Sequence, residues 1–362
     1  MIDRTLKHTR VQIGVRDIAD LALVSIGTVS RVLNNHPNVE ADLRLRVLDA
    51  VNKLGYVHHP RQTDRFLREV SEPDEGPNNK VQQITFCYRA GISPSFTAEM
   101  GNTYFPLVLQ GAEMACRQQN LHLRYRIIED DAKELPMARR ALSDSQAQAL
   151  LLVNFVDHEL VNGLLELKLP AVLVDHYFSD LPLDAVMNDS YYGAFQAVQH
   201  LIKNGHRKIA FVSGLSHYTI LRRFDGYCRA LNVADITYDP AWLLTGDLTV
   251  ESGVEAAHEF VRRKLDCTAI FCANDNTAFG VIQGLAQSGL QVPADISVMG
   301  FDDVEAARLV TPPLTTIRAN APALGRMAIR KLLERIYEPD LPITQTLVRS
   351  ELIERRSVRT IA

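Results

Sequence analysis

The chain has 362 residues, of which 46% are hydrophobic and 23% are charged, and its formal net charge is −4. This balance is typical of a globular protein, and the length predicts two or three folding units. No apolar run approaches the roughly 20 residues that cross a bilayer, and the N-terminal residues do not resemble a signal peptide, so we expect a cytoplasmic protein. The five cysteines are scattered without CxxC spacing, which disfavours a disulfide framework and a zinc site.

The charge is distributed unevenly along the chain. Residues 1–68 contain eleven Lys and Arg residues against seven Asp and Glu residues, so this part carries +4 and the remainder carries −8. A basic segment attached to an acidic body indicates local attraction to phosphate groups.

Three short helices are predicted over residues 15–57. The first spans about Asp17–Leu23, and the second spans Ile26–Asn34 with Ser25 as its N-cap. The third spans Ala41–Leu54, where apolar side chains recur at helical spacing and predict one buried face. The head of the chain is therefore expected to be a small all-α domain.

The composition changes after the head. Residues 69–80 have the acidic, Pro- and Asn-containing composition of a linker. From Val81 onward short apolar strands alternate with amphipathic helices, which predicts an α/β body with parallel sheets covered by helices. The predicted strands are Gln83–Tyr88, His122–Ile128, Ala149–Val153, Ala171–Val174, Lys208–Val212, Thr268–Cys272 and Ile296–Phe301. The predicted helices include Leu107–Gln119, Gly193–Asn204 and Asn276–Ser288.

The first two helices have the spacing of a helix-turn-helix. On the second helix, the apolar side chains lie on one face and the small and polar ones lie on the other, namely Gly27, Ser30, Arg31 and Asn34. Arg31 can pair with guanine in the major groove, and Thr28 and Ser30 can contact phosphate near the positive end of the helix. From spacing alone, a helical bundle with a solvated polar face remains an equal alternative.

The head resembles the DNA-binding heads of the lac repressor/galactose repressor family. The residues that match its pattern are Asp17, Ala19, Ala22, Val24, Ser25, Thr28, Val29, Ser30, Arg31, Val32, Leu33 and Asn34, followed by Arg44, Arg46, Val47, Leu54, Gly55 and Tyr56. The chain departs from the family at Leu23, where the family has its turn glycine. The recognition helix begins with Ile26 and Gly27, so Ile26 and Arg31 are expected to carry the base contacts.

The resemblance implies a transcriptional regulator whose DNA-binding residues are Ser25, Ile26, Gly27, Thr28, Ser30, Arg31, Asn34 and Tyr56. It also implies a hinge helix, because Pro60, Arg65 and Leu67 match the family pattern. Arg65 and Leu67 are then further DNA contacts, with Leu67 inserted into the minor groove. The alternative is that Leu67 packs on the body. We place the head at residues 12–58 and the hinge and linker at residues 59–80.

The body, residues 81–358, resembles the same family and the periplasmic sugar-binding proteins. The stretches that carry this resemblance are Asn204–Gly214, Arg223–Leu231, Ala269–Gly280, Val292–Asp303 and Pro312–Ile317. The fold implied is periplasmic-binding-protein-like, with two α/β lobes joined by three crossings near Asn188, Thr316 and Pro342. Lobe 1 then comprises residues 81–187 and 318–341, and lobe 2 comprises residues 188–317 and 342–358.

A small-molecule site is expected between the lobes, at the carboxyl ends of the strands. The residues that match cleft positions of the family are Tyr104, Phe105, Arg223, Asn274, Asp275 and Asp302. Core packing is the alternative for Tyr104 and Phe105. Helix capping is the alternative for Asp275.

The chain carries none of the usual catalytic motifs, so we expect no enzyme, no cofactor and no metal. The expected partners are an operator in double-stranded DNA, a second copy of the chain and an effector. The resemblance implies a sugar or a sugar derivative as effector, with a nucleobase or nucleoside as the alternative. Two rival hypotheses are a binding protein that only sequesters its ligand, and a DNA-binding dimer whose body has lost its ligand.

Overall fold

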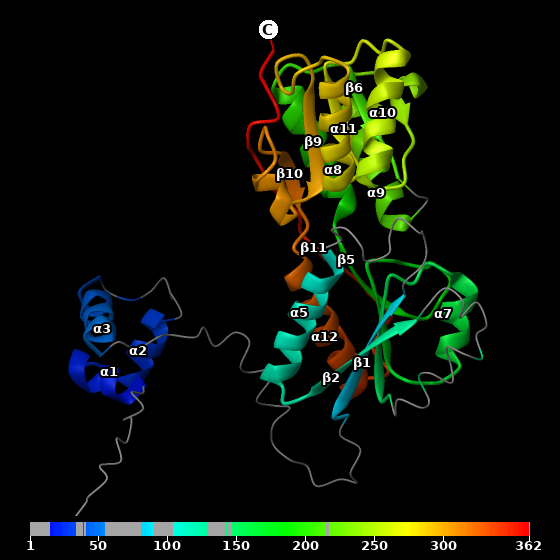
Figure 1. Ribbon diagram of the computed structural model, residues 1–362. Coiled ribbons are helices and arrows are strands. Elements are labelled where there is room, and N and C mark those ends of the chain that lie inside the picture. The colour runs from blue at the N-terminus through cyan, green and yellow to red at the C-terminus, as the bar shows by residue number, and fades with distance from the viewer. Residues whose placement is uncertain are drawn as a thin grey trace, which may run out of the picture. The chain divides into compact units, whose positions relative to one another are not determined.

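A computed structural model describes residues 15–33, 39, 41–54, 81–89, 104–128, 136, 142, 147–214 and 217–361. The chain divides into two compact units, Met1–Asn79 and Lys80–Ala362 (Figure 1). Of the residues predicted above, Asn34, Tyr56, Arg65 and Leu67 lie outside the described ones.

The first unit contains helices α1 (Val15–Ala22), α2 (Ile26–Leu33) and α3 (Ala41–Leu54). Their apolar side chains meet in one core, formed by Ile18, Ala19, Ala22, Val29, Val32, Val47 and Ala50. Ser25 caps α2 as predicted, because its Oγ accepts a hydrogen bond from the Thr28 amide at 3.1 Å. The predicted all-α head is confirmed.

The turn between α1 and α2 closes in a left-handed conformation at Leu23, where φ is 53°. The Leu23 amide donates to the Asp20 carbonyl at 3.3 Å, and the Val24 amide donates to the Ala19 carbonyl at 3.0 Å. These two bonds form a Schellman motif, which favours glycine at the left-handed residue. Arg46 of α3 completes the turn, because its Nη2 donates to the carbonyls of Ala22 at 2.6 Å and Leu23 at 3.0 Å.

The second unit contains two lobes, each built on a six-stranded sheet. In lobe 1 the strand order is β11-β5-β4-β3-β1-β2, and every neighbouring pair is parallel. Its strands are β1 (Gln83–Arg89), β2 (His122–Ile128), β3 (Ala149–Val153), β4 (Ala171–Val174), β5 (Asp184–Asn188) and β11 (Gln345–Val348). Its helices are α5 (Tyr104–Gln118), α7 (His158–Leu165) and α12 (Ala321–Tyr337).

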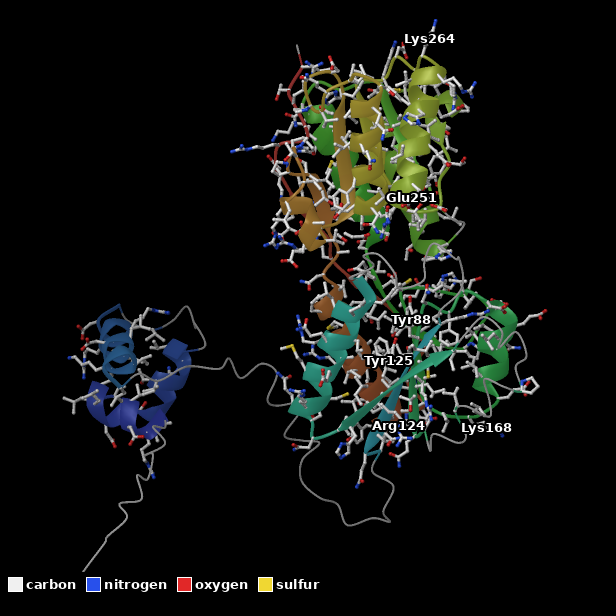
Figure 2. The ribbon with its side chains drawn as sticks, viewed as in Figure 1. Tyr88, Arg124, Tyr125, Lys168, Glu251 and Lys264 are labelled. Atoms are coloured by element: carbon white, nitrogen blue, oxygen red, sulfur yellow. The ribbon has the colours of Figure 1, made fainter. Side chains whose placement is uncertain are left out.

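The lobe 1 sheet is covered on both faces, as the unbroken apolar sequences of β3 and β4 require. Helices α5 and α12 pack side by side on one face, and their side chains form a core with the strands (Figure 1). Side chains of α7 take part in a separate core on the other face. Edge strand β2 is more exposed, and Figure 2 shows its residues Arg124 and Tyr125 beside β1.

In lobe 2 the strand order is β12-β10-β9-β8-β6-β7. The neighbouring pairs are parallel except β10 with β12. The strands are β6 (Ile209–Val212), β7 (Leu243–Leu244), β8 (Ala269–Cys272), β9 (Ser297–Asp302), β10 (Thr315–Arg318) and β12 (Glu351–Ile353). Helices α8 (Ser190–Lys203) and α9 (Tyr218–Val233) pack together, as do α10 (Val250–Arg262) and α11 (Asp275–Gln287). Two short 3-10 helices span Pro240–Trp242 and Glu305–Arg308.

The chain crosses between the lobes at three places. It leaves lobe 1 after β5, which ends at Asn188, and it returns after β10, which ends at Arg318. The third crossing was predicted near Pro342, which is wrong. Strand β11 pairs with β5 in lobe 1, so the chain crosses only after Val348. The four-residue strand lies at a sheet edge, and its side chains alternate between exposed and half-buried, so its sequence does not indicate which sheet it joins.

The carboxyl ends of the strands in the two lobes face each other. Figure 2 shows Tyr88, near the end of β1, closer to lobe 2 than Arg124, near the start of the parallel strand β2. In lobe 2, Glu251 in the first turn of α10 lies toward lobe 1, and Lys264 lies at the opposite end. Because helices of a parallel sheet begin where strands end, this arrangement brings the strand ends and helix starts of both lobes to one cleft.

Candidate DNA-binding and effector sites

Helix α2 exposes Gly27 and Arg31 of the polar face predicted from the sequence, whose Ser30 and Asn34 side chains lie outside the described ones. Val29 and Val32 are buried in the head core, whereas Ile26, Gly27 and Arg31 are exposed. The Arg31 Nε donates to the Gly27 carbonyl at 3.3 Å, so this side chain lies back along its own helix. The hydroxyls of Ser25 and Thr28 are 2.9 Å apart, which couples both to the start of the helix.

On the lobe 1 side of the cleft, the Tyr104 hydroxyl is hydrogen-bonded to two polar side chains. Its hydroxyl donates to Asp175 Oδ1 at 3.3 Å and accepts from Asn188 Nδ2 at 2.5 Å. The three residues come from the start of α5, the end of β4 and the end of β5. The Tyr104 side chain also packs against the hydrophobic cores of both lobes, so it lies where the lobes meet.

On the lobe 2 side, Arg223 of α9 contacts three other residues. Its side chain is buried, and its guanidinium lies over the Phe301 ring, 3.8 Å from the ring centroid. Its Nη2 donates to Asp302 Oδ1 at 3.2 Å, and its Nη1 donates to the Ala273 carbonyl. Its Nε has no hydrogen-bond partner among the described residues, so one buried donor remains open.

The charged groups of the two lobes act on each other. Burial raises the pKa of Asp175 to about 7, with the Arg223 guanidinium opposing the rise and Asp302 adding to it. Burial also raises the pKa of Asp302 to about 6, although its contact with Arg223 lowers it. The pKa of the Tyr104 hydroxyl lies well above its ordinary value because the group is buried next to Asp175. These mutual effects and the hydrogen bonds of Tyr104 join five residues in one polar cluster, namely Tyr104, Asp175, Asn188, Arg223 and Asp302.

Asp275 has a role that neither prediction described. The residue is fully buried, and its Oδ1 accepts from the Thr316 hydroxyl at 2.5 Å while its Oδ2 accepts from the Val304 amide at 2.9 Å. Burial raises its pKa well above the ordinary value. The N-cap of α11 is Asn274, whose Oδ1 accepts from the Thr277 amide at 2.9 Å. Asp275 therefore ties α11 to β10 and to the loop after β9.

The structure favours the core alternative for Phe105. Its side chain belongs to the lobe 1 core and lies 5.3 Å from the Tyr88 ring, measured between centroids. The neighbouring carboxylates Asp302 and Asp303 have different partners. Asp303 accepts from Arg318 at 2.8 Å and from Arg355, so it belongs to the interior of lobe 2.

Sequence reasoning missed two residues of the polar cluster. Asp175 directly follows the predicted strand Ala171–Val174, at the carboxyl end where the site was expected, and its φ of 64° is left-handed. Asn188 was identified only as a crossing point, yet its side chain is buried at the end of β5. Its Oδ1 has no hydrogen-bond partner within the described ranges, so the cluster also holds an open acceptor.

No group of three or more His, Cys, Asp or Glu side chains among the described residues is arranged to hold a metal ion. No helix in the same residues combines the length and apolar character needed to span a membrane.

Comparisons with known proteins agree with this architecture. Residues 15–59 match the family described as bacterial regulatory proteins, lacI family, and residues 198–358 match the periplasmic binding protein-like domain. The chain is 31% identical to the ribose operon repressor of Haemophilus influenzae over 348 residues, which cover 96% of this chain and 99% of that protein. It is 30% identical over 351 residues to the HTH-type transcriptional repressor PurR of Mannheimia succiniciproducens, with the same coverage of both.

Among solved structures, a LacI family transcriptional regulator from Enterococcus faecalis V583 with bound ribose superposes with a TM-score of 0.65. It is 26% identical and covers 77% of this chain and 100% of its own. The similarity to full-length repressors extends over the head and both lobes. The chain therefore belongs to the lacI family of bacterial regulatory proteins, which are DNA-binding transcriptional regulators and not enzymes.

Proposed function

We propose that this protein is a repressor whose affinity for its operator is set by an uncharged sugar bound between the lobes. The choice of a sugar rests on two buried polar groups in the polar cluster, one a hydrogen-bond donor and the other an acceptor. Arg223 Nε is an unpaired donor and Asn188 Oδ1 is an unpaired acceptor within the described part of the cleft. A hydroxyl both donates and accepts, so a polyhydroxylated ligand satisfies both kinds of group.

The charge of the cluster argues against a phosphorylated effector. The Arg223 guanidinium is already paired with Asp302, and Asp175 lies on the opposite wall. A phosphate brought between these carboxylates meets like charge on both walls of the cleft. We therefore expect ribose or a related neutral sugar, in keeping with the relative named ribose operon repressor and with the ribose-bound neighbour.

A nucleobase is the second candidate because of the relative named PurR. A planar base needs an aromatic face to stack on, and the Tyr104 ring in this cleft packs against both lobe cores. We therefore rank a sugar first. In this proposal Tyr104, Asp175, Asn188, Arg223 and Asp302 contact the effector, while Asn274 and Asp275 hold the frame around it.

For the DNA side, we propose that α2 enters the major groove and that two copies of the chain bind a near-palindromic operator. One head covers one half-site, and a two-fold dimer matches a two-fold operator. Ser25 and Thr28 are then placed at phosphate, and Ile26 and Arg31 at base edges. Such a protein acts in the cytoplasm, where its operator lies.

The experiment is operator binding by the full-length protein with ribose, ribose 5-phosphate or adenine, together with calorimetry of each ligand. We expect ribose to bind and to change operator affinity, and ribose 5-phosphate not to bind. Arg223→Gln should abolish the response to ribose but keep operator binding. Arg222→Gln is the matched control, because this neighbouring arginine is only half-buried and pairs with Asp225. Binding of ribose 5-phosphate or adenine in place of ribose would contradict the choice of effector, and loss of the sugar response in Arg222→Gln would contradict the site.

A further inference from the structure

The recognition helix begins with an apolar side chain that the head core does not use. Ile26 is the first residue of α2, and 48% of it is exposed. The buried side of the same helix is supplied by Val29 and Val32, which are at most 4% exposed. Ile26 therefore contributes little to the stability of the head, and it presents a branched hydrocarbon to whatever α2 contacts.

The surface next to Ile26 is open. A Cβ built on Gly27 would meet only Ser25 Oγ, at 3.7 Å, among the described residues. Arg31, one turn later, lies back along the helix and donates its Nε to the Gly27 carbonyl at 3.3 Å. The exposed face of α2 thus carries an apolar group at its first turn, a gap at the next residue and a guanidinium beyond the gap. The gap allows a base edge to approach the helix backbone closely.

The major-groove edges of the four bases offer one apolar group, the C5 methyl of thymine. A hydrocarbon side chain at the start of a recognition helix gains free energy from contact with that methyl and gains nothing from the polar edges of the other bases. We propose that Ile26 recognises the C5 methyl of one thymine in each operator half-site. This proposal rests on the proposed entry of α2 into the major groove.

The proposal separates the roles of Ile26 and Arg31. Arg31 can donate two hydrogen bonds to guanine, so it reads polar atoms of a base. Ile26 reads a methyl group, so its contribution follows the methyl and not the base. Cytosine that carries a C5 methyl should therefore substitute for thymine at the Ile26 position, whereas uracil should not.

The test starts with an operator selected from random DNA by the full-length protein. Each thymine of the half-site is then replaced, one at a time, by deoxyuridine, which removes only the methyl. We expect one position at which wild-type affinity falls about fourfold per half-site, the factor expected for burying one methyl group. In Ile26→Ala the same replacement should have no effect. At this position 5-methylcytosine should bind more tightly than cytosine to wild type, and equally to Ile26→Ala.

Leu48→Ala is the control, because it removes a comparably exposed side chain (44%) from α3. Replacing the thymine by deoxyuridine should weaken the binding of this variant as much as that of wild type. The methyl contact is excluded if no replacement of a thymine by deoxyuridine lowers operator affinity, or if the replacement lowers the affinity of Ile26→Ala as well. These results leave operator binding itself intact. If the selection instead recovers no preferred sequence, the proposed entry of α2 into the major groove fails, and the methyl contact fails with it.

Discussion

Leu23 occupies a left-handed position that the backbone of the turn requires, and its side chain is 82% exposed. A side chain in this conformation costs about 1–2 kcal/mol, whereas glycine costs about 0.5–1 kcal/mol in conformational entropy. We therefore expect Leu23→Gly to stabilise the head by about 0.5–1 kcal/mol. Hydrogen exchange of the α1 and α3 amides in the full-length protein measures this change.

Leu21→Gly provides the control for that prediction. Leu21 is also exposed, but it lies within α1, where glycine should destabilise the helix by about 1 kcal/mol. Equal destabilisation by the two glycines would show that the turn gains nothing from a left-handed glycine.

Arg31 is the other residue of the head whose chemistry predicts a measurable effect. Its guanidinium is exposed on the face of α2 that carries Ile26 and Gly27, and a bidentate contact with guanine is worth about 1–3 kcal/mol. We expect Arg31→Ala to weaken operator binding by about that amount and to relax one base position in each half-site. Gel-shift titrations on the operator and on random DNA measure it, and an equal loss on both would identify Arg31 as a phosphate contact.

At the scale of elements, one buried ion pair holds the segment between α12 and β11. Arg335 donates its Nε to Asp184 Oδ2 at 2.8 Å and its Nη1 to the carbonyls of Pro339 at 2.7 Å and Leu341 at 2.6 Å. Asp184, whose side chain is 1% exposed, also accepts from the Thr344 amide at 2.8 Å. The pair therefore fixes the chain that leads into β11 against the start of β5.

Removing one member of this pair should leave a buried, uncompensated charge. We expect Arg335→Met to lower the free energy of unfolding by about 3–5 kcal/mol, measured by urea denaturation. Arg117→Met removes an exposed pair with Glu113 and should change it by less than about 1 kcal/mol. A double variant, Asp184→Asn with Arg335→Met, should recover part of the loss. No recovery would mean that the carbonyl contacts of Arg335 matter more than its charge.

At the scale of the whole molecule, the ionisation of Asp175 in the cleft makes the stability of the body depend on pH. Because the pKa of Asp175 is about 7 in the folded protein, the folded state binds more protons than the unfolded state between about pH 4 and pH 7. This group therefore stabilises the fold least above pH 7, and its contribution grows as the pH falls toward 4. The slope for one proton is at most about 1.4 kcal/mol per pH unit.

Asp175→Asn removes this titration while keeping the shape of the protonated carboxyl. We expect the stability of the variant relative to wild type to rise as the pH increases from 5 to 8, measured by urea denaturation at each pH. Asp302 shifts in the same direction and remains in the variant, so only the difference between the two proteins is informative. A difference that stays constant with pH would show that Asp175 keeps its ordinary pKa in the fold.

The aromatic residues show how the lobes contact each other in this conformation. Tyr218 of α9 in lobe 2 packs against a core of lobe 1, and its ring centroid lies 5.6 Å from that of Tyr177 and 6.1 Å from that of His176. Tyr104 makes the reciprocal contact from lobe 1. A ligand shifts the balance between lobe positions only through a difference in its affinity for them.

Much of this protein follows from local sequence. The helices of the head follow from apolar spacing and from Ser25, whose cap involves residues three positions apart. Strands β2, β3 and β4 follow from apolar or alternating runs whose bounds match the predicted ones. Arg223 and Asp302 were predicted from the family resemblance, and the structure brings them together at 3.2 Å.

Tertiary structure decided the features that depend on partners distant in the chain. The hydrogen bonds of Asp275 depend on Thr316, 41 residues away, whose hydroxyl donates to Asp275 Oδ1. The roles of Asp175 and Asn188 depend on the Tyr104 hydroxyl, 71 and 84 residues away. Strand β11 joins lobe 1 through hydrogen bonds to β5. Local sequence sets which backbone conformation a segment prefers, whereas hydrogen bonds between distant groups depend on how the elements pack.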